Sequence, residues 1–585
     1  MKTIAIIGGG CSGLTAIKCC LDEGLTPVCF ERENDIGGLW NYKENSKVGT
    51  GSVYRSCVMN TSKEMMAFSD FPPPDDFPVF LPHRQVNQYF QLYADNFDLR
   101  KYIKFRTDVT RIVPSPDYDH SGCWDVTYCS CSGSDPGRVT RRFDGVLICS
   151  GHHTFPVTPE FEGQDGFQGK IMHTHSYRSN KELADQKVLV VGIGNSGADI
   201  AVDISHAASQ VYLSTRRGAW IINRKGFWGL PADAMANSRF AFMLPKSVLQ
   251  WGVEKMSNFN FDHNKFGIRP ANRALQSHPT INDELPLRLL TGSIKIKPNV
   301  RHFSHEKVSF EDGSLEEIDT VIFATGYNYT IPMVDESITR VKDNETCLYK
   351  FMYPPHLKHP TLGIIGLVQA IGAVMPISEI QCRWYTRVIK GLCKLPSESE
   401  MMADIELKRE TVANGYYTAK RHTIQTFWID YMDDVAEQFG AKPNLWRTFF
   451  EDPYLALNCV FGPCLPAQYR LEGPGKWNGA KSSIINAMNR YSASMHTKVM
   501  PKNHNSSGSQ NINVNSALTD KMNVDSSLSS GIRNRISAFL LNKNDNSSLK
   551  ATFPNKDIVA SFPAFLKSFY TLFIVMFLFF CMCLV

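Results

Sequence analysis

Two short stretches, "TIAIIGGGCSGL" at residues 3–14 and "KVLVVGIGNSGA" at residues 187–198, constrain the fold of this chain more than any other feature. Each runs from an apolar strand through glycines spaced as G-x-G-x-x-G into an apolar helix. In such a unit the first glycine permits a tight turn, the second lets a pyrophosphate approach the backbone, and the third lets the helix pack on the strand. We therefore predict that the chain binds two dinucleotides.

The first turn is followed by the strand "TPVCFER", which contains Glu31. A carboxylate there accepts hydrogen bonds from both ribose hydroxyls and repels a 2′-phosphate, which favours FAD or NAD over NADPH. The following "ENDIGGLW" adds Gly37 and Gly38, a turn that packs along an extended FAD in flavoproteins with two nucleotides, so FAD is favoured. The residues predicted to contact FAD are Gly8, Gly9, Gly10, Cys11, Ser12, Gly13, Glu31, Gly38, Leu39 and Trp40.

The second turn is followed by "SQVYLSTRRGAW", which has hydroxyl and guanidinium groups where the first unit has Glu31. These groups suit a 2′-phosphate and indicate NADPH, which would donate hydride to the flavin. We expect Ser196 and Asp199 to cap the helix beneath the nucleotide. The predicted NADPH residues are Gly192, Gly194, Asn195, Ser196, Gly197, Ala198, Asp199, Ser214, Thr215, Arg216 and Arg217.

The order of these segments predicts an α/β fold with two Rossmann-like domains, the NADPH domain being inserted in the FAD domain. The FAD domain is expected to span 1–155 and 326–500, and the NADPH domain 156–325. Residues 222–290 lack strand alternation and are predicted to form a helical insertion over the substrate route.

The C-terminal part has a different composition. Residues 501–560 are rich in Asn and Ser and are predicted to form a flexible linker. The stretch "FYTLFIVMFLFFCMCLV" that follows has no charged residue, and as a helix it would span about 25 Å. A C-terminal membrane helix at 562–585 is therefore predicted; a buried helix of the globular body is the alternative. With the first strand starting near Thr3 there is no room for a signal peptide, so the body should face the cytosol.

Composition excludes other classes of function. The formal net charge is +5, and no run of basic residues interleaved with aromatics indicates a nucleic-acid partner. The 16 cysteines contain no Cys-x-x-Cys pair, so neither a metal site nor a disulfide reductase with its redox cysteine pair is predicted.

The stretch "FQGKIMHTHSY" places Phe167, Gly169, His173 and Tyr177 in the pattern F-x-G-x-x-x-H-x-x-x-[FYW]. Together with both glycine turns, "NTSKEMM" (60–66), "GHH" (151–153) and "FATGY" (323–327), this resembles the flavin-containing monooxygenases of the dimethylaniline N-oxide-forming type, from about residue 3 to residue 500. The later "GPGKWNGA" resembles the vertebrate microsomal members, which implies an endoplasmic reticulum membrane.

The resemblance implies a mechanism. NADPH reduces FAD, NADP⁺ stays bound, oxygen adds to give a 4a-hydroperoxyflavin, and a soft nitrogen or sulfur nucleophile of a small lipophilic xenobiotic or metabolite takes the distal oxygen. Asn60 matches the family asparagine beside flavin and nicotinamide, with Met59 and Thr61 framing it. A neutral amide suits this task, because it donates a hydrogen bond without supplying a proton. His173 is expected to orient the linker between the domains, with a role as base as the alternative.

Three other functions stay open. Baeyer-Villiger oxygenation of ketones to esters is one, because "STRRGAW" and "MPISEIQCRW" resemble the fifth mammalian form of the family. An NADPH oxidase that releases hydrogen peroxide is another, and a membrane-tethered NADPH sensor is the third. Ala370 stands where many relatives carry a different residue near the flavin, so substrate preference is not carried over. A homo-oligomer is compatible with the sequence.

Overall fold

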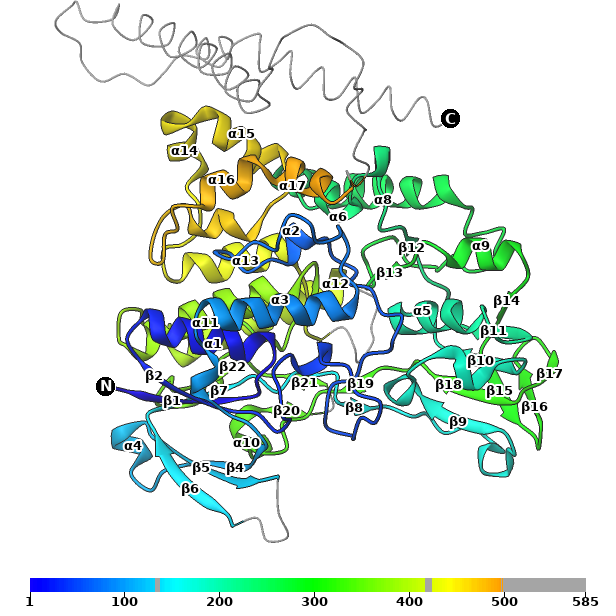
Figure 1. The fold of residues 1–585 in the computed structure, drawn as a ribbon, viewed down its shortest axis with the longest axis horizontal. Helices are drawn as coiled ribbons and strands as arrows, with labels where there is room; N and C mark the ends of the chain where they lie inside the picture. The colour runs from blue at the N-terminus through cyan, green and yellow to red at the C-terminus, as the bar shows by residue number, and fades with distance from the viewer. Residues whose placement is uncertain (132–136, 343, 416–422, 496, 498–585) are drawn as a thin grey trace, which may run out of the picture. The chain divides into compact units, whose positions relative to one another are not determined.

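The fold is described from a computed structural model, which describes residues 1–131, 137–342, 344–415, 423–495 and 497. Residues 1–497 form one compact unit. Two five-stranded parallel sheets organise it, at opposite sides of the view in Figure 1. The predictions of an α/β fold and of two nucleotide-type sheets are thereby confirmed.

The first sheet has the strand order β22-β7-β1-β2-β3. Its strands are β1 (Thr3–Ile7), β2 (Thr26–Phe30), β3 (Ile103–Lys104), β7 (Gly145–Ile148) and β22 (Leu362–Ile364). Helix α1 (Cys11–Asp22) follows β1 and packs against α11 (Val374–Ile389), which is buried along nearly its whole length. The run "IAII" in β1 is fully apolar because this sheet is covered on both faces.

The second sheet has the strand order β14-β11-β10-β18-β9. Its strands are β9 (Lys170–His173), β10 (Lys187–Val191), β11 (Gln210–Ser214), β14 (Ile294–Lys297) and β18 (Thr320–Phe323). Helix α5 (Asn195–Ile204) follows β10, as α1 follows β1. The buried run "VLVV" of β10 is central in this sheet, again as expected for a strand covered on both faces.

The chain passes between the two sheets by two connections that run side by side. On the way out it forms β8 (Phe155–Pro156), and on the way back β19 (Tyr327–Asn328). These two short strands pair with each other in antiparallel fashion. Thr325 adds a hydrogen bond from its Oγ1 to the carbonyl oxygen of Val157, 2.5 Å away.

The segment predicted to be a helical insertion is helical only in part. Helices α6 (Ala232–Ala236), α7 (Arg239–Met243), α8 (Lys246–Asn260) and α9 (Leu285–Leu290) lie in it. Between α8 and α9 the chain is irregular except for β13 (Thr280–Ile281), which pairs in parallel with β12 (Ile221–Ile222). In Figure 1, α6 and α8 lie on the side where α17 lies, away from β15 to β17.

The remaining strands form small sheets of two or three strands, and the remaining helices lie between or beside the elements described above. The other strands are β4 (Thr107–Pro114), β5 (Trp124–Ser130), β6 (Val139–Phe143), β15 (Val300–Phe303), β16 (Lys307–Phe310), β17 (Leu315–Glu317), β20 (Val341–Lys342), β21 (Glu345–Thr346), β23 (Gln369–Ile371) and β24 (Gln425–Phe427). The other helices are α2 (Lys63–Met66), α3 (His83–Asn96), α4 (Tyr118–Ser121), α10 (Glu336–Thr339), α12 (Glu398–Gly415), α13 (Trp428–Glu437), α14 (Leu445–Glu451), α15 (Pro453–Phe461), α16 (Ala480–Ile485) and α17 (Ala487–Ala493).

The predicted linker at 501–560 and the predicted membrane helix at 562–585 lie outside the described residues. Among the helices of the described ranges, none combines the length and the apolar composition that crossing a membrane requires.

Candidate functional site

The two glycine turns have the same backbone geometry. Gly8 and Gly192 come directly after β1 and β10, with φ of +108° and +112°, a region that favours glycine. A Cβ on Gly13 would lie 1.8 Å from the carbonyl oxygen of Gly8, and a Cβ on Gly197 would lie 1.9 Å from that of Gly192. Neither α1 nor α5 has a side-chain cap, so the first-turn amides are available to a phosphate. Both turns therefore fit a pyrophosphate.

The expectation that Ser196 and Asp199 cap α5 is wrong. The N-cap is Gly194, and no side chain caps the helix, because Asp199 lies inside it. The Asp199 carboxylate instead accepts hydrogen bonds from the Tyr54 hydroxyl at 2.9 Å and from Nδ2 of Asn282 at 2.7 Å. Burial raises the pKa of Asp199. This residue therefore joins the helix of the second turn to a segment that follows the first.

Glu31 is buried at the end of β2, next to the first turn. Its Oε2 accepts the N–H of Gly9 at 2.5 Å, and its Oε1 accepts the N–H of Glu33 at 2.8 Å. Two backbone donors thus fix the carboxylate at the wall of the cavity described below. It retains lone pairs that can accept from ribose hydroxyls.

The corresponding residues of the second unit differ in exposure and in charge. Arg216 is exposed, and within the described ranges no carboxylate pairs with it. Thr215 accepts the N–H of Gly218 through its Oγ1 at 3.0 Å. The Ser214 hydroxyl, which we expected near the 2′-phosphate, donates to the carbonyl oxygen of Pro298 at 2.7 Å.

Both turns open into one cavity of about 1530 Å³. Its wall also includes Met59, Asn60 and Thr61 from the segment before α2. All the residues predicted to contact the two nucleotides line it except Gly9, Gly13 and Ala198. The structure thus brings two predicted sites, 184 residues apart in the sequence when counted from Gly8 to Gly192, into one space.

Asn60 is half-buried at the cavity wall, and its side chain is held from behind. Its Oδ1 accepts a hydrogen bond from Nη2 of Arg224 at 2.7 Å. Two residues after Asn60, Ser62 donates both its backbone N–H, at 2.7 Å, and its hydroxyl, at 2.9 Å, to the carboxylate of Asp233. Arg224 and Asp233 both belong to the segment predicted as the insertion, so this segment fixes the Asn60 loop.

The other polar residues of the "NTSKEMM" motif have structural partners. Lys63 is fully buried, and its Nζ donates to the carbonyl oxygens of Asp75 and Phe77, each at 2.8 Å. Glu64 is buried and accepts from Nε of Arg490 at 3.0 Å. The motif therefore combines a cavity-facing part, with Asn60, and a buried part that holds it in place.

His173 lies on β9 and does not line the cavity. Its Nδ1 accepts the N–H of His175 at 3.0 Å, and its ring packs edge-on against Tyr327, with the centroids 5.2 Å apart. Burial, with His175 as a smaller cause, lowers the pKa of His173 to about 4. This position, beside the return strand β19, fits the expected orienting role rather than that of a base.

Among the residues of the cavity wall that sequence reasoning did not assign are His152, His153 and Gln369. His152 is half-buried, and burial lowers its pKa well below its usual value, so its ring is neutral near pH 7, whereas His153 is exposed at the cavity wall. A signal for the histidines was present, because they follow the carboxyl end of β7, where ligands of parallel sheets bind. Gln369, on β23, offered no such signal.

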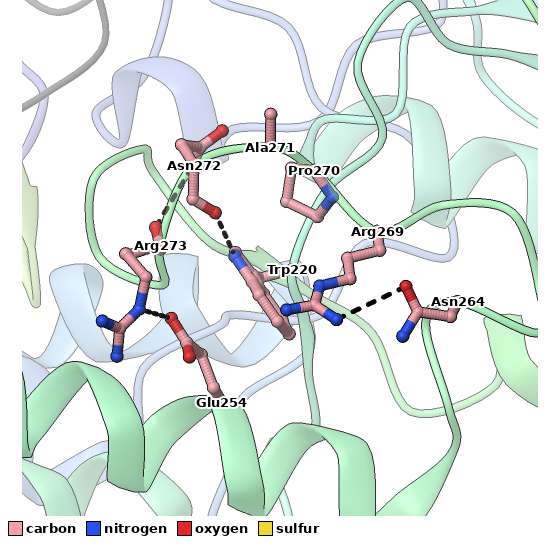
Figure 2. Close-up of a pocket in the computed structure, with 8 residues that line it drawn as sticks. All are labelled: Trp220, Glu254, Asn264, Arg269, Pro270, Ala271, Asn272 and Arg273. Carbon is pink, nitrogen blue, oxygen red and sulfur yellow. Dashed lines mark hydrogen bonds and ion pairs between the residues drawn. The ribbon is translucent and has the colours of Figure 1, made fainter.

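A smaller pocket of about 370 Å³ lies beside Trp220. Figure 2 shows that its two charged walls are an ion pair between Arg273 and Glu254 and an arginine, Arg269, next to the indole. Asn272 lines both this pocket and the large cavity. The smaller pocket is open and polar, and none of the predicted site residues lies in it.

Two parallel sheets, each ending in a glycine turn that opens into one shared cavity, define the class of flavoproteins that bind two dinucleotides. The sequence profile of the family described as "Flavin-binding monooxygenase-like" matches residues 1–520, and the chain belongs to this family. It is thus an NADPH-dependent flavoprotein monooxygenase that uses FAD and NADP, and the resemblance found in the sequence is confirmed.

Similar proteins support this membership. "Flavin-containing monooxygenase 5" of Mus musculus is 50% identical over 88% of this chain and 96% of its own length. "Dimethylaniline monooxygenase [N-oxide-forming] 2" of Mus musculus is 45% identical over 85% of this chain and 94% of its own. The solved structure of S-allyl-L-cysteine S-oxygenase from Allium sativum is 25% identical, has a TM-score of 0.59, and covers 84% of this chain and 98% of its own.

Proposed function

We propose that the first glycine turn holds FAD and the second holds NADPH. The support is the contrast between the buried carboxylate of Glu31, which suits two ribose hydroxyls, and the exposed guanidinium of Arg216, which suits a 2′-phosphate. The remaining predicted contacts follow the same division. In domain terms, FAD is bound by 1–155 and 326–500, and NADPH by 156–325.

The proposed reaction is oxygenation of soft nitrogen or sulfur nucleophiles in small lipophilic molecules. The observation that carries it is the single cavity, lined by both turns and by Asn60, in which a reduced flavin and a nicotinamide can meet. Bound reduced flavin supplies the electrons that activate O₂. Relatives named for N-oxide formation and for S-oxygenation, at 45% and 25% identity, support these substrate classes.

Asn60 is the residue that we propose to act at the reacting atoms. Its amide nitrogen has no hydrogen-bond partner among the described residues, while its oxygen is occupied by Arg224. A neutral N–H group in a cavity can donate a hydrogen bond without releasing a proton. The chain thereby provides a donor where an acid would divert the reaction to hydrogen peroxide.

Product analysis tests the reaction. A thioether, a tertiary amine and a linear ketone are each incubated with the enzyme, NADPH and O₂, and products and hydrogen peroxide are measured. We expect sulfoxide and N-oxide, with little peroxide. Ester from the ketone without sulfoxide would replace the proposal by Baeyer-Villiger oxygenation, and peroxide matching all NADPH consumed would replace it by an oxidase.

We also propose that residues 562–585 anchor the protein in the endoplasmic reticulum membrane, with the enzyme on the cytosolic side and residues 501–560 as a tether. Exposed apolar side chains on α14 and α15 support contact with lipid, among them Trp446, at 72% exposure, and Phe450, at 81%. A chain truncated after residue 561 should be released from microsomes by alkaline carbonate, whereas the full chain should not. Equal release of both would contradict the anchor.

A further inference from the structure

The Asn60 side chain faces a residue that can only donate hydrogen bonds. Arg224 directs Nη2 at Oδ1 of Asn60, 2.7 Å away. A guanidinium has five N–H donors and no acceptor, so it can face the oxygen of a carboxamide but not its nitrogen. The chemistry of the pair therefore decides which way the amide points, and Nδ2 is left for the cavity.

Arg224 is itself fixed by two carboxylates. Asp283 accepts the backbone N–H of Arg224 at 2.9 Å and its Nη1 at 3.0 Å, so one residue holds both main chain and side chain. Asp199 lies 3.7 Å from Nη2 and is in turn held by Tyr54 and Asn282. The Arg224 side chain is only 13% exposed.

Arg224 does not line the cavity, so it reaches the site only through Asn60. It follows β12, on the NADPH side, whereas Asn60 lies in the FAD part. Asp233, from the same insertion, accepts hydrogen bonds from both the backbone N–H and the hydroxyl of Ser62. The insertion therefore grips the Asn60 loop at two points, two residues apart.

We propose that Arg224 is a positioning residue that sets the amide orientation of Asn60, so that Nδ2 and not Oδ1 is presented to the flavin and oxygen. This inference rests on the proposed role of Asn60. Without the guanidinium both amide orientations are open, and the one with Oδ1 toward the cavity offers no donor. The insertion then acts on the chemistry by orienting an FAD-side residue, in addition to covering the substrate route.

The test compares Arg224→Met, Arg224→Lys, Asn60→Asp and the double variant Arg224→Met/Asn60→Asp, in the full chain loaded with FAD. The product formed per NADPH is measured with a thioether, together with FAD content and the Kd of NADP⁺. Arg447→Met, which removes an exposed i,i+4 partner of Glu451 on α14, is the matched control and should behave as wild type.

We expect Arg224→Met to lower product per NADPH by at least two-fold, with hydrogen peroxide making up the difference and with FAD content and NADP⁺ affinity within two-fold of wild type. Arg224→Lys, which keeps a donor-only cation, should recover part of this loss. Asn60→Asp lacks the donor and should lower the yield further. The double variant should be no worse than Asn60→Asp, because a carboxylate has no orientation to set.

The proposal would be overturned if Arg224→Met formed as much product per NADPH as wild type. It would also be overturned if the fold-loss of product per NADPH in the double variant equalled the product of the two single fold-losses. A second readout does not depend on activity. Asn60→Asp should raise the urea midpoint of unfolding when Arg224 is present, because the guanidinium pairs with the new carboxylate. In the Arg224→Met background the same substitution should lower the midpoint, because the carboxylate has no partner. If wild type gives no oxygenated product, the proposed function fails, but the urea midpoints of the four proteins still show whether Arg224 and residue 60 interact. Equal midpoint shifts for Asn60→Asp in the wild-type and Arg224→Met backgrounds would overturn the proposed interaction.

Discussion

The two glycine turns share a backbone geometry and differ in the side chains that stand at the end of the next strand. Their first glycines have φ values within a few degrees, and a Cβ added to the third glycine would lie 1.8 Å from the carbonyl oxygen of the first glycine in one turn and 1.9 Å in the other. At the end of the next strand, however, the first unit has the buried Glu31 and the second the exposed Arg216. On the proposed assignment of the two sites, the backbone geometry suits the pyrophosphate common to both nucleotides, while one or two side chains would select between them.

The largest effect is expected from substitutions of the third glycine, which both turns share. Gly197→Ala and Gly13→Ala each push a Cβ into a carbonyl oxygen, so helix and strand must separate. We expect a loss of stability of about 3 kcal/mol or more, at the upper end of overpacking costs. Gly197→Ala should lose NADPH-dependent flavin reduction but keep FAD, and Gly13→Ala should be isolated without FAD; absorbance of the purified proteins measures both.

Gly252→Ala is the control for these variants. Gly252 lies within α8, and nothing lies within 4 Å of the added Cβ. This substitution should leave both nucleotides bound and change the free energy of unfolding by less than about 1 kcal/mol, in the stabilising direction. Equal loss of NADPH binding in Gly252→Ala and Gly197→Ala would mean that the turn has no special role.

A smaller effect is expected where the two units differ. Arg216→Ala removes a guanidinium from the 2′-phosphate and should lower selectivity for NADPH over NADH by about 10- to 100-fold, which corresponds to the roughly 1.5–3 kcal/mol of a hydrogen bond to a charged group. Glu31→Gln should leave this selectivity unchanged and weaken FAD by about 10-fold. The ratio of kcat/KM for the two nucleotides and the FAD Kd measure these effects.

Unchanged nucleotide selectivity in Arg216→Ala would show that another group reads the 2′-phosphate. Arg217→Ala is the neighbouring comparison, and a larger effect there would move the assignment by one residue. A change of selectivity in Glu31→Gln would mean that the two sites are exchanged.

The smallest expected effect is a loss of folding stability at low pH, caused by His263 in the part of the chain that follows the second glycine turn. His263 is fully buried, accepts the N–H of Ile221 through Nε2 at 3.0 Å and meets Oδ1 of Asn258 through Nδ1 at 2.8 Å. Burial lowers its pKa to about 4. Between about pH 6.5 and pH 4 the unfolded chain therefore binds the proton and the folded chain does not, so stability falls as the pH is lowered.

From pH 7 to pH 5.5 this residue should cost about 1 kcal/mol of the free energy of unfolding. Urea unfolding at the two pH values measures it. In His263→Asn, which cannot bind a proton in this range, the difference between the two pH values should shrink by that amount, even though the variant is less stable at both. An unchanged pH dependence would show that His263 is protonated in the folded protein.

Much of this molecule could be predicted from local patterns. In each unit the apolar strand, the glycine turn and the residue at the end of the next strand lie within about 30 residues of each other. Each of these local patterns favours one backbone conformation. The two parallel sheets, the return of the chain at 323–327 and the parts of the cavity wall formed by the two glycine turns follow from them. The capping role of Ser196 and Asp199 was predicted wrongly, because Asp199 is drawn to Tyr54 and Asn282, which are distant in sequence.

What the sequence determined by itself is which backbone can form a glycine turn of the dinucleotide-binding type and which charge follows the next strand, because both depend on neighbours along the chain. The tertiary structure decided what the side chains do once folded. It commits the Ser214 hydroxyl to Pro298, 84 residues away, and places Arg224 against Asn60, 164 residues away. A hydrogen-bonding group takes the partner that folding brings within about 3 Å, and no spacing in the sequence records that partner.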